Sequence, residues 1–197
     1  VHVPCALLSL TCYSAQAIGA FIYLIWPIKP LMRLVLSAHL PTLFLVFQTL
    51  VSGSLWGYPT WGTWWAWDAR LTSELVLFVM MLFQLAILNS PLKDKKKITR
   101  YYALCLVIGW LDIPIVHFSV QWWNTLHQGY SLSWTSASSI DPVYYYPLIA
   151  CIVNQIFWLV AIVAKRYKLY EHFLSHNTSN QYPERFLQPQ SQGHTPR

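Results

Sequence analysis

Histidines and a run of tryptophans are the residues of this chain whose types and spacing could do chemistry. The run places five indole rings within twelve residues: Trp56, Trp61, Trp64, Trp65 and Trp67. Such a broad, flat aromatic surface suits a large planar apolar ligand. A neutral imidazole is a good axial ligand for haem iron, and two imidazoles on opposite faces would hold a porphyrin against those rings. The pattern therefore favours a site for a planar metal complex.

The candidate iron ligands are His2 and His117, because each is expected at the outer end of a membrane span, at the depth of the tryptophan run. Taken singly, either histidine could instead be an interfacial residue that only forms hydrogen bonds. His127 follows in the same outer segment and could be a ligand, a hydrogen-bond donor or a plain loop residue; we favour a supporting role. Trp122 and Trp123, which lie between His117 and His127 in the sequence, are expected to extend the aromatic surface.

Charged residues follow the tryptophan run and leave two roles open. Arg70 and Glu74 have the i, i+4 spacing that puts both on one helical face, and Asp68 lies just before them. Charges at this depth are costly unless they are paired or functional. The three residues could form an ion-paired collar that fixes the loop to the helix, or Arg70 could neutralise a propionate of the ligand. Asp112 lies inside a span and is expected to find a partner at a kink made by Pro114.

The composition identifies the elements that must position these residues. Of the 197 residues, 55% are hydrophobic and 10% are charged, which is typical of an integral membrane protein. About 20 apolar residues cross a hydrocarbon core roughly 30 Å thick. The apolar stretches are uniform rather than alternating, so we predict an all-α, polytopic transmembrane helical bundle rather than a barrel. Five spans are expected, at about 3–27, 35–56, 71–90, 101–119 and 143–164.

Lysine and arginine predict the orientation of these spans, because short cytoplasmic loops are enriched in both. The outer loops, at about 56–70 and 117–142, contain a single basic residue, Arg70. The remaining basic residues lie mainly in three stretches assigned to the cytoplasmic side: 29–33, 93–100 and 165–168. These stretches are expected to contact anionic membrane lipid rather than nucleic acid. The N-terminus is then outside and no methionine begins the chain, so we expect a preceding span to be missing.

The chain is predicted to have one transmembrane domain over residues 1–170 and a polar tail. The tail, at 171–197, has few apolar residues and is predicted to be disordered on the cytoplasmic side. His39 is expected toward the inner end of the second span, too deep to join the tryptophan run.

Several motifs resemble those of one known family. The stretch from Trp61 to Leu75 is similar to the tryptophan-rich "WWD" signature of haem-handling membrane proteins. Within that superfamily the chain most resembles cytochrome c maturation protein C, also called haem exporter protein C. Further matches are the opening His2-Val3-Pro4, the stretch 113–129 and the stretch 139–142. The resemblance covers residues 2 to about 165, with the motifs in the expected order.

The resemblance implies a membrane haem-delivery protein of cytochrome c maturation. It implies six spans and an outer, tryptophan-rich site that holds haem b non-covalently, with axial ligands that would fall on His2 and His117. The haem would be presented to a membrane-anchored periplasmic haem chaperone, with ABC transporter subunits and a small single-span subunit as further partners. The chaperone would supply the covalent chemistry, so a delivery protein is expected rather than an enzyme. The bacterial inner membrane is the expected location, with the mitochondrial inner membrane as an alternative.

Two other functions compete with haem delivery. A permease that exports haem through the bundle should have a polar path across its spans. The sequence offers four candidates for such a path: His39, Asp112, Asn154 and Gln155. A haem-lyase-type enzyme is expected to be much longer, with a larger outer domain.

Overall fold

Helices form the described part of the chain, which in this computed structural model comprises residues 1–91, 94–123, 125–127 and 142–180. There are six: α1 (His2–Ile25), α2 (Lys29–Trp61), α3 (Ala69–Leu88), α4 (Lys95–Gly109), α5 (Asp112–Trp122) and α6 (Pro142–Asn180). Five stretches are long and apolar enough to cross a membrane, with α4 and α5 together forming one of them. The predicted all-helical bundle with five spans is confirmed.

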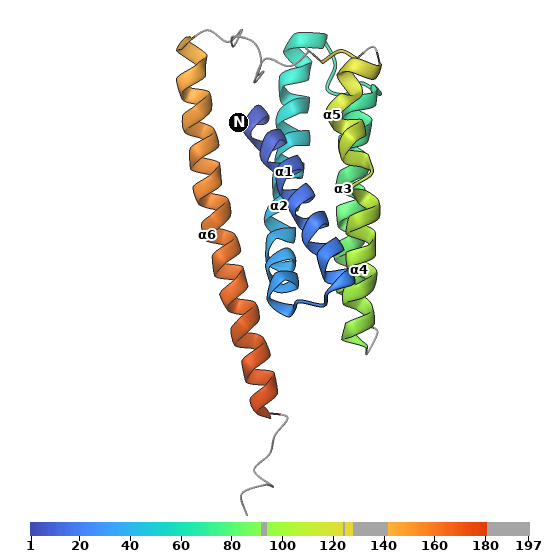
Figure 1. Cartoon of the computed structure of the whole chain (residues 1–197). Coiled ribbons are helices and arrows are strands. Elements are labelled where there is room, and N and C mark those ends of the chain that lie inside the picture. The colour runs from blue at the N-terminus through green and yellow to red at the C-terminus, as the bar shows by residue number, and fades with distance from the viewer. Residues whose placement is uncertain (92–93, 124, 128–141, 181–197) are drawn as a thin grey trace, which may run out of the picture.

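The helices alternate in direction, so the connections gather at two ends (Figure 1). The N-terminus, the turn between α2 and α3 and the end of α5 lie toward the upper end of the view. The connections from α1 to α2 and from α3 to α4 lie at the lower end. The tryptophan run and the lysine-rich connections are therefore at opposite ends, as the predicted topology requires.

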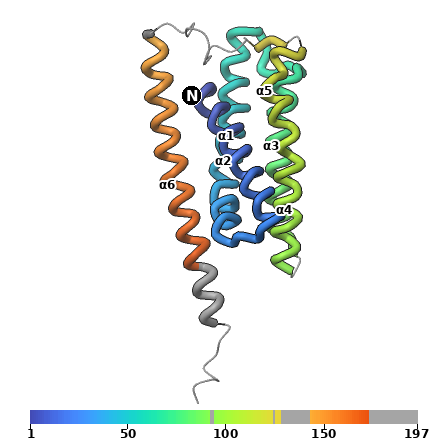
Figure 2. Tube along the Cα trace, viewed as in Figure 1, coloured from blue at the N-terminus to red at the C-terminus, as the bar shows by residue number. Residues whose placement is uncertain are grey.

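The core lies among α1 to α4, while α6 is peripheral. Large buried side chains from α1, α3 and α4 meet in the centre, including Tyr13, Leu77, Met81, Tyr102 and Leu106. About 50% of the α1 span is buried, but only 6% of the α6 span is. Figure 2 shows α6 along one side of the bundle, where it packs mainly on α2. Most of the α6 surface therefore faces away from the other helices.

The fourth span is broken at Trp110 and Leu111, between α4 and α5. Pro114 has no N–H, and its ring would collide with the carbonyl four residues earlier, which is that of Trp110. The Trp110 carbonyl accepts instead from the Ile113 N–H at 3.1 Å. The kink expected at Pro114 is thus a break between two helices. Oδ2 of Asp112 is buried and receives no hydrogen bond from the described residues, so the expected partner of this carboxyl is not found there.

Helix α2 is longer than predicted and includes the first two tryptophans of the run. It continues five residues beyond the predicted end and stops at Gly62, which has a φ of 74°. Glycine adopts this left-handed conformation without strain, and the Gly62 N–H donates to the Tyr58 carbonyl at 2.9 Å. The predicted outer loop at 56–70 is therefore a turn of residues 62–68. The longer helix keeps more backbone N–H and C=O groups hydrogen-bonded than a loop over residues 57–61 would, and unpaired backbone groups are costly near hydrocarbon.

Helix α6 continues to Asn180, nine residues beyond residue 171, at which the polar tail was predicted to begin. Glu171 accepts a hydrogen bond from Arg33 of α2 at 3.1 Å, so the helix is tied to the bundle beyond the predicted end of its span. The rest of the predicted tail, residues 181–197, lies outside the described residues.

A close approach between α1 and α4 depends on Gly109. The hydroxyl of Tyr13 donates to the Leu106 carbonyl at 3.4 Å and accepts from Nε2 of Gln84 at 2.8 Å. A Cβ at Gly109 would overlap this hydroxyl. The glycine therefore leaves the space in which three helices share one polar contact.

We expect Gly109→Ala to lower the free energy of unfolding by about 1–3 kcal/mol, because the added methyl displaces the Tyr13 hydroxyl. Tyr13→Phe alone should cost about 1 kcal/mol, in the range of hydrogen bonds between membrane helices. The double variant should lose less than the sum, because the overlapping oxygen is gone. Reversible unfolding in mixed detergent micelles, followed by circular dichroism, measures these energies. Tyr101→Phe, at an exposed position of α4, is the matched control, and strictly additive losses would contradict the predicted contact.

Candidate functional site

His2 is held against α2 in an orientation suited to metal ligation. Its Nδ1 lies 3.1 Å from the Thr49 carbonyl oxygen and 3.2 Å from the Ser52 hydroxyl. Gly53 makes room for the ring, since a Cβ there would lie 2.9 Å from Cε1 of His2. A carbonyl oxygen only accepts, so this contact favours the tautomer with the proton on Nδ1 and the lone pair on Nε2. The histidines of metal sites are commonly oriented in this way.

His127 lies beside Asp68 and Trp61. Its ring centroid is 5.0 Å from that of Trp61, at an interplanar angle of 63°. Nδ1 is 3.6 Å from Oδ2 of Asp68, longer than a hydrogen bond, and finds no hydrogen-bond partner among the described residues. Burial, reinforced by the positive charge of Arg70, lowers the pKa of His127 to about 4, against the opposing effect of Asp68. The imidazole is therefore neutral at pH 7.

The carboxylate of Asp68 connects two parts of the outer end. Oδ1 accepts from the Leu71 N–H at 2.8 Å, which caps the N-terminus of α3. A carboxylate is favourable there because it satisfies an unpaired N–H and faces the positive end of the helix dipole. Oδ2 accepts from the Leu126 N–H at 3.3 Å. One side chain therefore starts α3 and holds the segment 125–127 beside it.

His2 and His127 both line one small cavity at the outer end of the bundle. Trp65, Arg70 and Glu74 are also among its lining residues. Its volume is about 30 Å³, which is room for a water molecule but far too little for a porphyrin. The structure thus shows the site closed, with the two imidazoles on walls that come from α1 and from the segment after α5.

Arg70 joins α3 to α5 rather than pairing with Glu74. A guanidinium nitrogen of Arg70 donates to the Val116 carbonyl at 2.9 Å. Glu74 is only 6% exposed, and its Oε1 receives no hydrogen bond within the described ranges. No Arg70–Glu74 ion pair is found there, so this part of the expected collar is not formed. The buried Glu74 carboxyl, whose Oε1 has no hydrogen-bond partner among the described residues, instead lines the cavity together with the two imidazoles.

His117 lies on the exposed side of α5 and is not among the residues that line the cavity. The neighbours Val116 and Ser119 are the buried residues of that helix. The His117 ring contacts Phe118, with centroids 4.7 Å apart and an interplanar angle of 88°. The structure therefore brings His2 together with His127 rather than with His117. His117 as an iron ligand stays a prediction.

The tryptophans divide into an inner and an outer group. Trp65 lines the cavity and Trp61 contacts His127, whereas Trp64 and Trp67 are 53% and 79% exposed. Trp56 packs edge-on against Trp61 with centroids 5.4 Å apart. The outer group therefore leaves apolar rings on the surface around the cavity.

A second set of exposed rings belongs to the end of α5. Trp122 and Trp123 are 56% and 51% exposed, and Phe118 stacks on Trp122 with centroids 5.4 Å apart. The predicted outer loop continues through residues 128–141, which lie outside the described residues.

The contact of His2 with α2 was not predicted from the sequence. Thr49, Ser52 and Gly53 are small or polar residues at i, i+3 and i+4 in an otherwise apolar helix. This spacing puts them on one helical face, and that could have indicated a contact with a polar group of another helix.

The four side chains considered for a permease path are dispersed. His39 is buried, with Nε2 3.2 Å from the Met81 carbonyl oxygen. Nε2 of Gln155 donates to Sγ of Cys5 at 3.1 Å, and Asn154 is exposed. None of these three, nor Asp112, lines the outer cavity.

The lowered pKa of His127 predicts that acid opens the outer segment. An exposed imidazole titrates near 6.5, so an open form takes up more protons than the closed form between pH 6.5 and about 4. The closed form is therefore fully stable above pH 6.5 and loses stability as the pH falls through that range. Histidine-selective NMR in micelles should assign a midpoint near 4 to His127, with His127→Gln identifying the signal. Trp61→Ala should move the midpoint toward 6.5, and a wild-type midpoint of 6.5 would contradict the burial.

A known protein family matches most of this chain. The family described as "Heme exporter protein C" (CcmC) matches residues 1–181. Heme exporter protein C of Haemophilus influenzae is 40% identical over 170 residues, which cover 86% of this chain and 68% of the relative. Heme exporter protein C of Escherichia coli is 44% identical over 149 residues, covering 75% of this chain and 59% of the relative.

A mitochondrial relative is also similar. A ccmC-like mitochondrial protein of Marchantia polymorpha, named for cytochrome c biosynthesis, is 44% identical over 135 residues, or 68% of this chain and 55% of the relative. The chain thus spans 55% to 68% of the length of these three relatives. Taken with the five spans and the tryptophan-rich outer end, the matches show that this multi-pass membrane protein belongs to the Heme exporter protein C (CcmC) family.

Proposed function

We propose that this chain binds haem at its outer end and delivers it to a membrane-anchored haem chaperone during cytochrome c maturation. One observation carries the proposal: His2 and His127 line the same cavity under the tryptophan run. Each of the two rings turns its Nδ1 toward an oxygen acceptor, the Thr49 carbonyl or the Asp68 carboxylate. This arrangement suits ligation through Nε2 on both sides. The names of the relatives, which refer to haem export and cytochrome c biosynthesis, support it.

The closed cavity must open before haem can bind between these histidines. His2 is fixed by α1 and α2, whereas Leu126, which precedes His127, is held by a hydrogen bond of 3.3 Å to Asp68. The segment 125–127 is therefore the wall that moves in our proposal. His127 then approaches the iron from one face and His2 from the other, with Trp61 and Trp65 against the macrocycle.

Other residues of the outer end fit a ligand that stays only briefly. Arg70, which lines the cavity, would pair with a propionate through guanidinium nitrogens other than the one that contacts Val116. The exposed rings of Trp64, Trp67, Trp122 and Trp123 would present the edge of the haem to the chaperone. Such a site supplies position and ligation, and the chaperone supplies the covalent bond.

We propose that the chain lies in the bacterial inner membrane with its haem site facing the periplasm, with the mitochondrial inner membrane as the alternative. The bacterial relatives and the mitochondrial protein of Marchantia polymorpha support these two locations. Haem-chaperone-releasing ABC transporter subunits and a small single-span subunit are the proposed further partners.

We expect the purified protein with added haem to show the optical spectrum of six-coordinate low-spin iron. His2→Ala and His127→Ala should each convert it to a five-coordinate spectrum, because one axial ligand is lost. His117→Ala should leave it unchanged if His127 is the second ligand. His39→Ala, which removes a buried histidine far from the cavity, is the control for general damage.

Each outcome of this experiment separates two hypotheses. Loss of the low-spin spectrum in His117→Ala but not in His127→Ala would restore the ligand pair that the family resemblance implies. An unchanged spectrum in His2→Ala would refute both pairs. Haem transport into sealed vesicles by the chain alone would favour the permease instead.

The contacts of Asp68 predict that its charge and its capping role can be separated. Asn remains a good helix cap but has no charge, so Asp68→Asn should keep the helix and weaken haem affinity about tenfold, as changes behind a metal ligand commonly do. Asp68→Ala should in addition lower the free energy of unfolding by about 1 kcal/mol. Haem titration followed by absorbance, together with unfolding in mixed micelles, measures both effects.

The matched control is Asp94, which caps α4 at the opposite end of the bundle through the N–H groups of Lys96 and Lys97. Asp94→Asn should change neither haem affinity nor stability substantially. Equal haem affinity in Asp68→Asn and wild type would show that Asp68 positions the segment but does not influence the ligand.

A further inference from the structure

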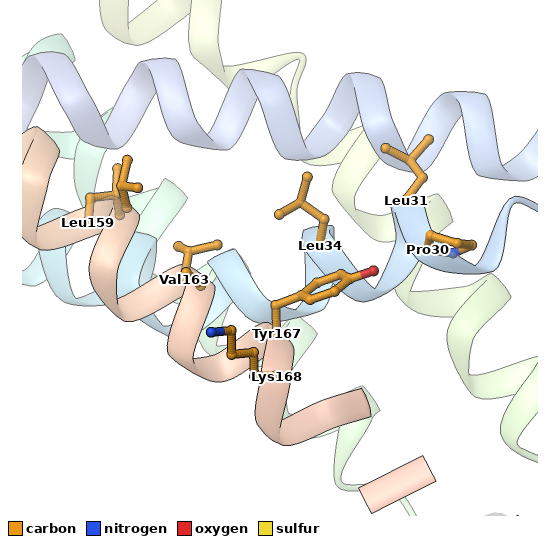
Figure 3. A pocket seen from close by; sticks show the side chains of 9 residues that line it. Pro30, Leu31, Leu34, Leu159, Val163, Tyr167 and Lys168 are labelled. Atoms are coloured by element: carbon orange, nitrogen blue, oxygen red, sulfur yellow. The ribbon is translucent and has the colours of Figure 1, made fainter. Parts of the chain in front are cut away.

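A long groove runs between α6 and the beginning of α2, at the lysine-rich end of the molecule. In Figure 3, Leu31 and Leu34 of α2 lie opposite Leu159 and Val163 of α6. The groove has a volume of about 720 Å³, within the range of sites that hold small organic ligands. Its walls are apolar over most of their length. This groove is separate from the outer cavity and from the tryptophan run.

Helix α6 is attached to the bundle by side-chain hydrogen bonds at three levels along its described length, and the groove lies beside α6 between the first and the last of these levels. Toward the outer end, Gln155 donates to Cys5 of α1 at 3.1 Å. In the inner half, Nε of Arg166 donates to the Ser37 carbonyl of α2 at 3.0 Å, and Arg33 of α2 donates to Glu171 at 3.1 Å. Between these levels α6 contributes the small side chain of Ala164, which does not fill the gap. An empty gap in hydrocarbon would forfeit dispersion contacts along both walls.

The length of the groove matches one leaflet of a bilayer. Leu159 and Lys168, which line its two ends, are nine residues apart on α6, or about 14 Å along a helix. Half of a hydrocarbon core is about 15 Å. Tyr167 lies beside Lys168 at the inner end, and tyrosine is enriched where hydrocarbon meets water. The groove therefore runs from the membrane surface toward the middle of the bilayer.

The mouth of the groove carries unbalanced positive charge. Lys168 is exposed, and no ion pair of Lys168 is found in the described part of the chain. The nearby acid, Glu171, is already paired with Arg33, whose guanidinium lies 5.6 Å from the centre of the Tyr167 ring. Lys29 adds a further charge directly before Pro30, which lines the groove. An anion bound here would be attracted by Lys168 and Lys29 and would not have to break the ion pair between Arg33 and Glu171.

We propose that the groove binds an anionic phospholipid of the inner leaflet, with one acyl chain between α2 and α6 and the phosphate at Lys168. The chain length, the apolar walls and the position of the charge all fit this ligand, and the cytoplasmic leaflet is the one in which anionic lipids attract basic residues. The lipid completes the contact of α6 with the bundle. Lipid binding here does not depend on haem binding at the other end.

Native mass spectrometry of the full chain, released from detergent micelles, tests the proposal. The probes are phosphatidylglycerol and phosphatidylethanolamine with identical palmitoyl and oleoyl chains. We expect one phosphatidylglycerol to remain bound at lipid concentrations at which phosphatidylethanolamine does not. Lys168→Gln should weaken phosphatidylglycerol binding about fivefold, because one lysine near the membrane surface contributes about that factor.

Two pairs of variants make the result specific. Lys168→Gln is matched with Lys96→Gln, an exposed lysine of α4 at the same end of the bundle, which should bind the lipid like wild type. Ala164→Trp fills the groove and should abolish retention of the bound lipid. Its control is Val79→Trp, at an exposed position of α3 outside the groove, which should retain it.

Three outcomes would overturn the proposal. Equal retention of the two lipids would show that the groove takes only annular lipid without regard to charge. Equal losses in Lys168→Gln and Lys96→Gln would show general attraction to a basic surface, and unchanged retention in Ala164→Trp would place the lipid elsewhere. Co-purification of a small polypeptide in place of lipid, displaced by Ala164→Trp, would identify a partner helix as the occupant.

Discussion

The carboxylate of Asp68 is the contact on which the outer end depends. It caps α3 with one oxygen and holds Leu126 with the other, so that His127 is positioned by the same group that begins a membrane helix. The site is thereby built on a helix end rather than on a free loop. The longer of these two contacts, at 3.3 Å, lies on the side that moves in the proposed function. A rigid wall at His2 and a lightly held wall at His127 suit a protein that receives a cargo and gives it up again.

The helices also differ in how much of their surface is buried. Helices α1 and α2 supply most of the buried surface of the bundle, and α1 also presents His2 at its first residue. Helix α6 buries little of its surface, and the groove lies along its inner half. The outer cavity and the proposed lipid groove therefore lie at opposite ends of the bundle, and α2 contributes to the lining of both. Their separation lets each be changed without direct contact with the other.

The five spans could be predicted from composition, because in hydrocarbon only helices satisfy the backbone and each must be long enough to cross. The ends of α2 and α6 could not, since capping by Gly62 and the tie of Glu171 to Arg33 are contacts that a hydropathy pattern does not contain. For the candidate site, predicted membrane depth selected His2 and His117. The predicted depth of a residue in the membrane does not give the face of the helix on which its side chain lies. His117 lies on the exposed face of α5, whereas Val116 and Ser119 lie on the buried face.

The break at Trp110 and Leu111 separates α5 from α4 within a single membrane crossing. Because Pro114 removes the hydrogen bond that would make the two helices continuous, α5 can change its tilt at little cost in backbone bonding. Arg70 couples that tilt to α3 through the Val116 carbonyl. The short upper piece can therefore turn as a lever, while the lower part of the same crossing stays packed against α1 and α3.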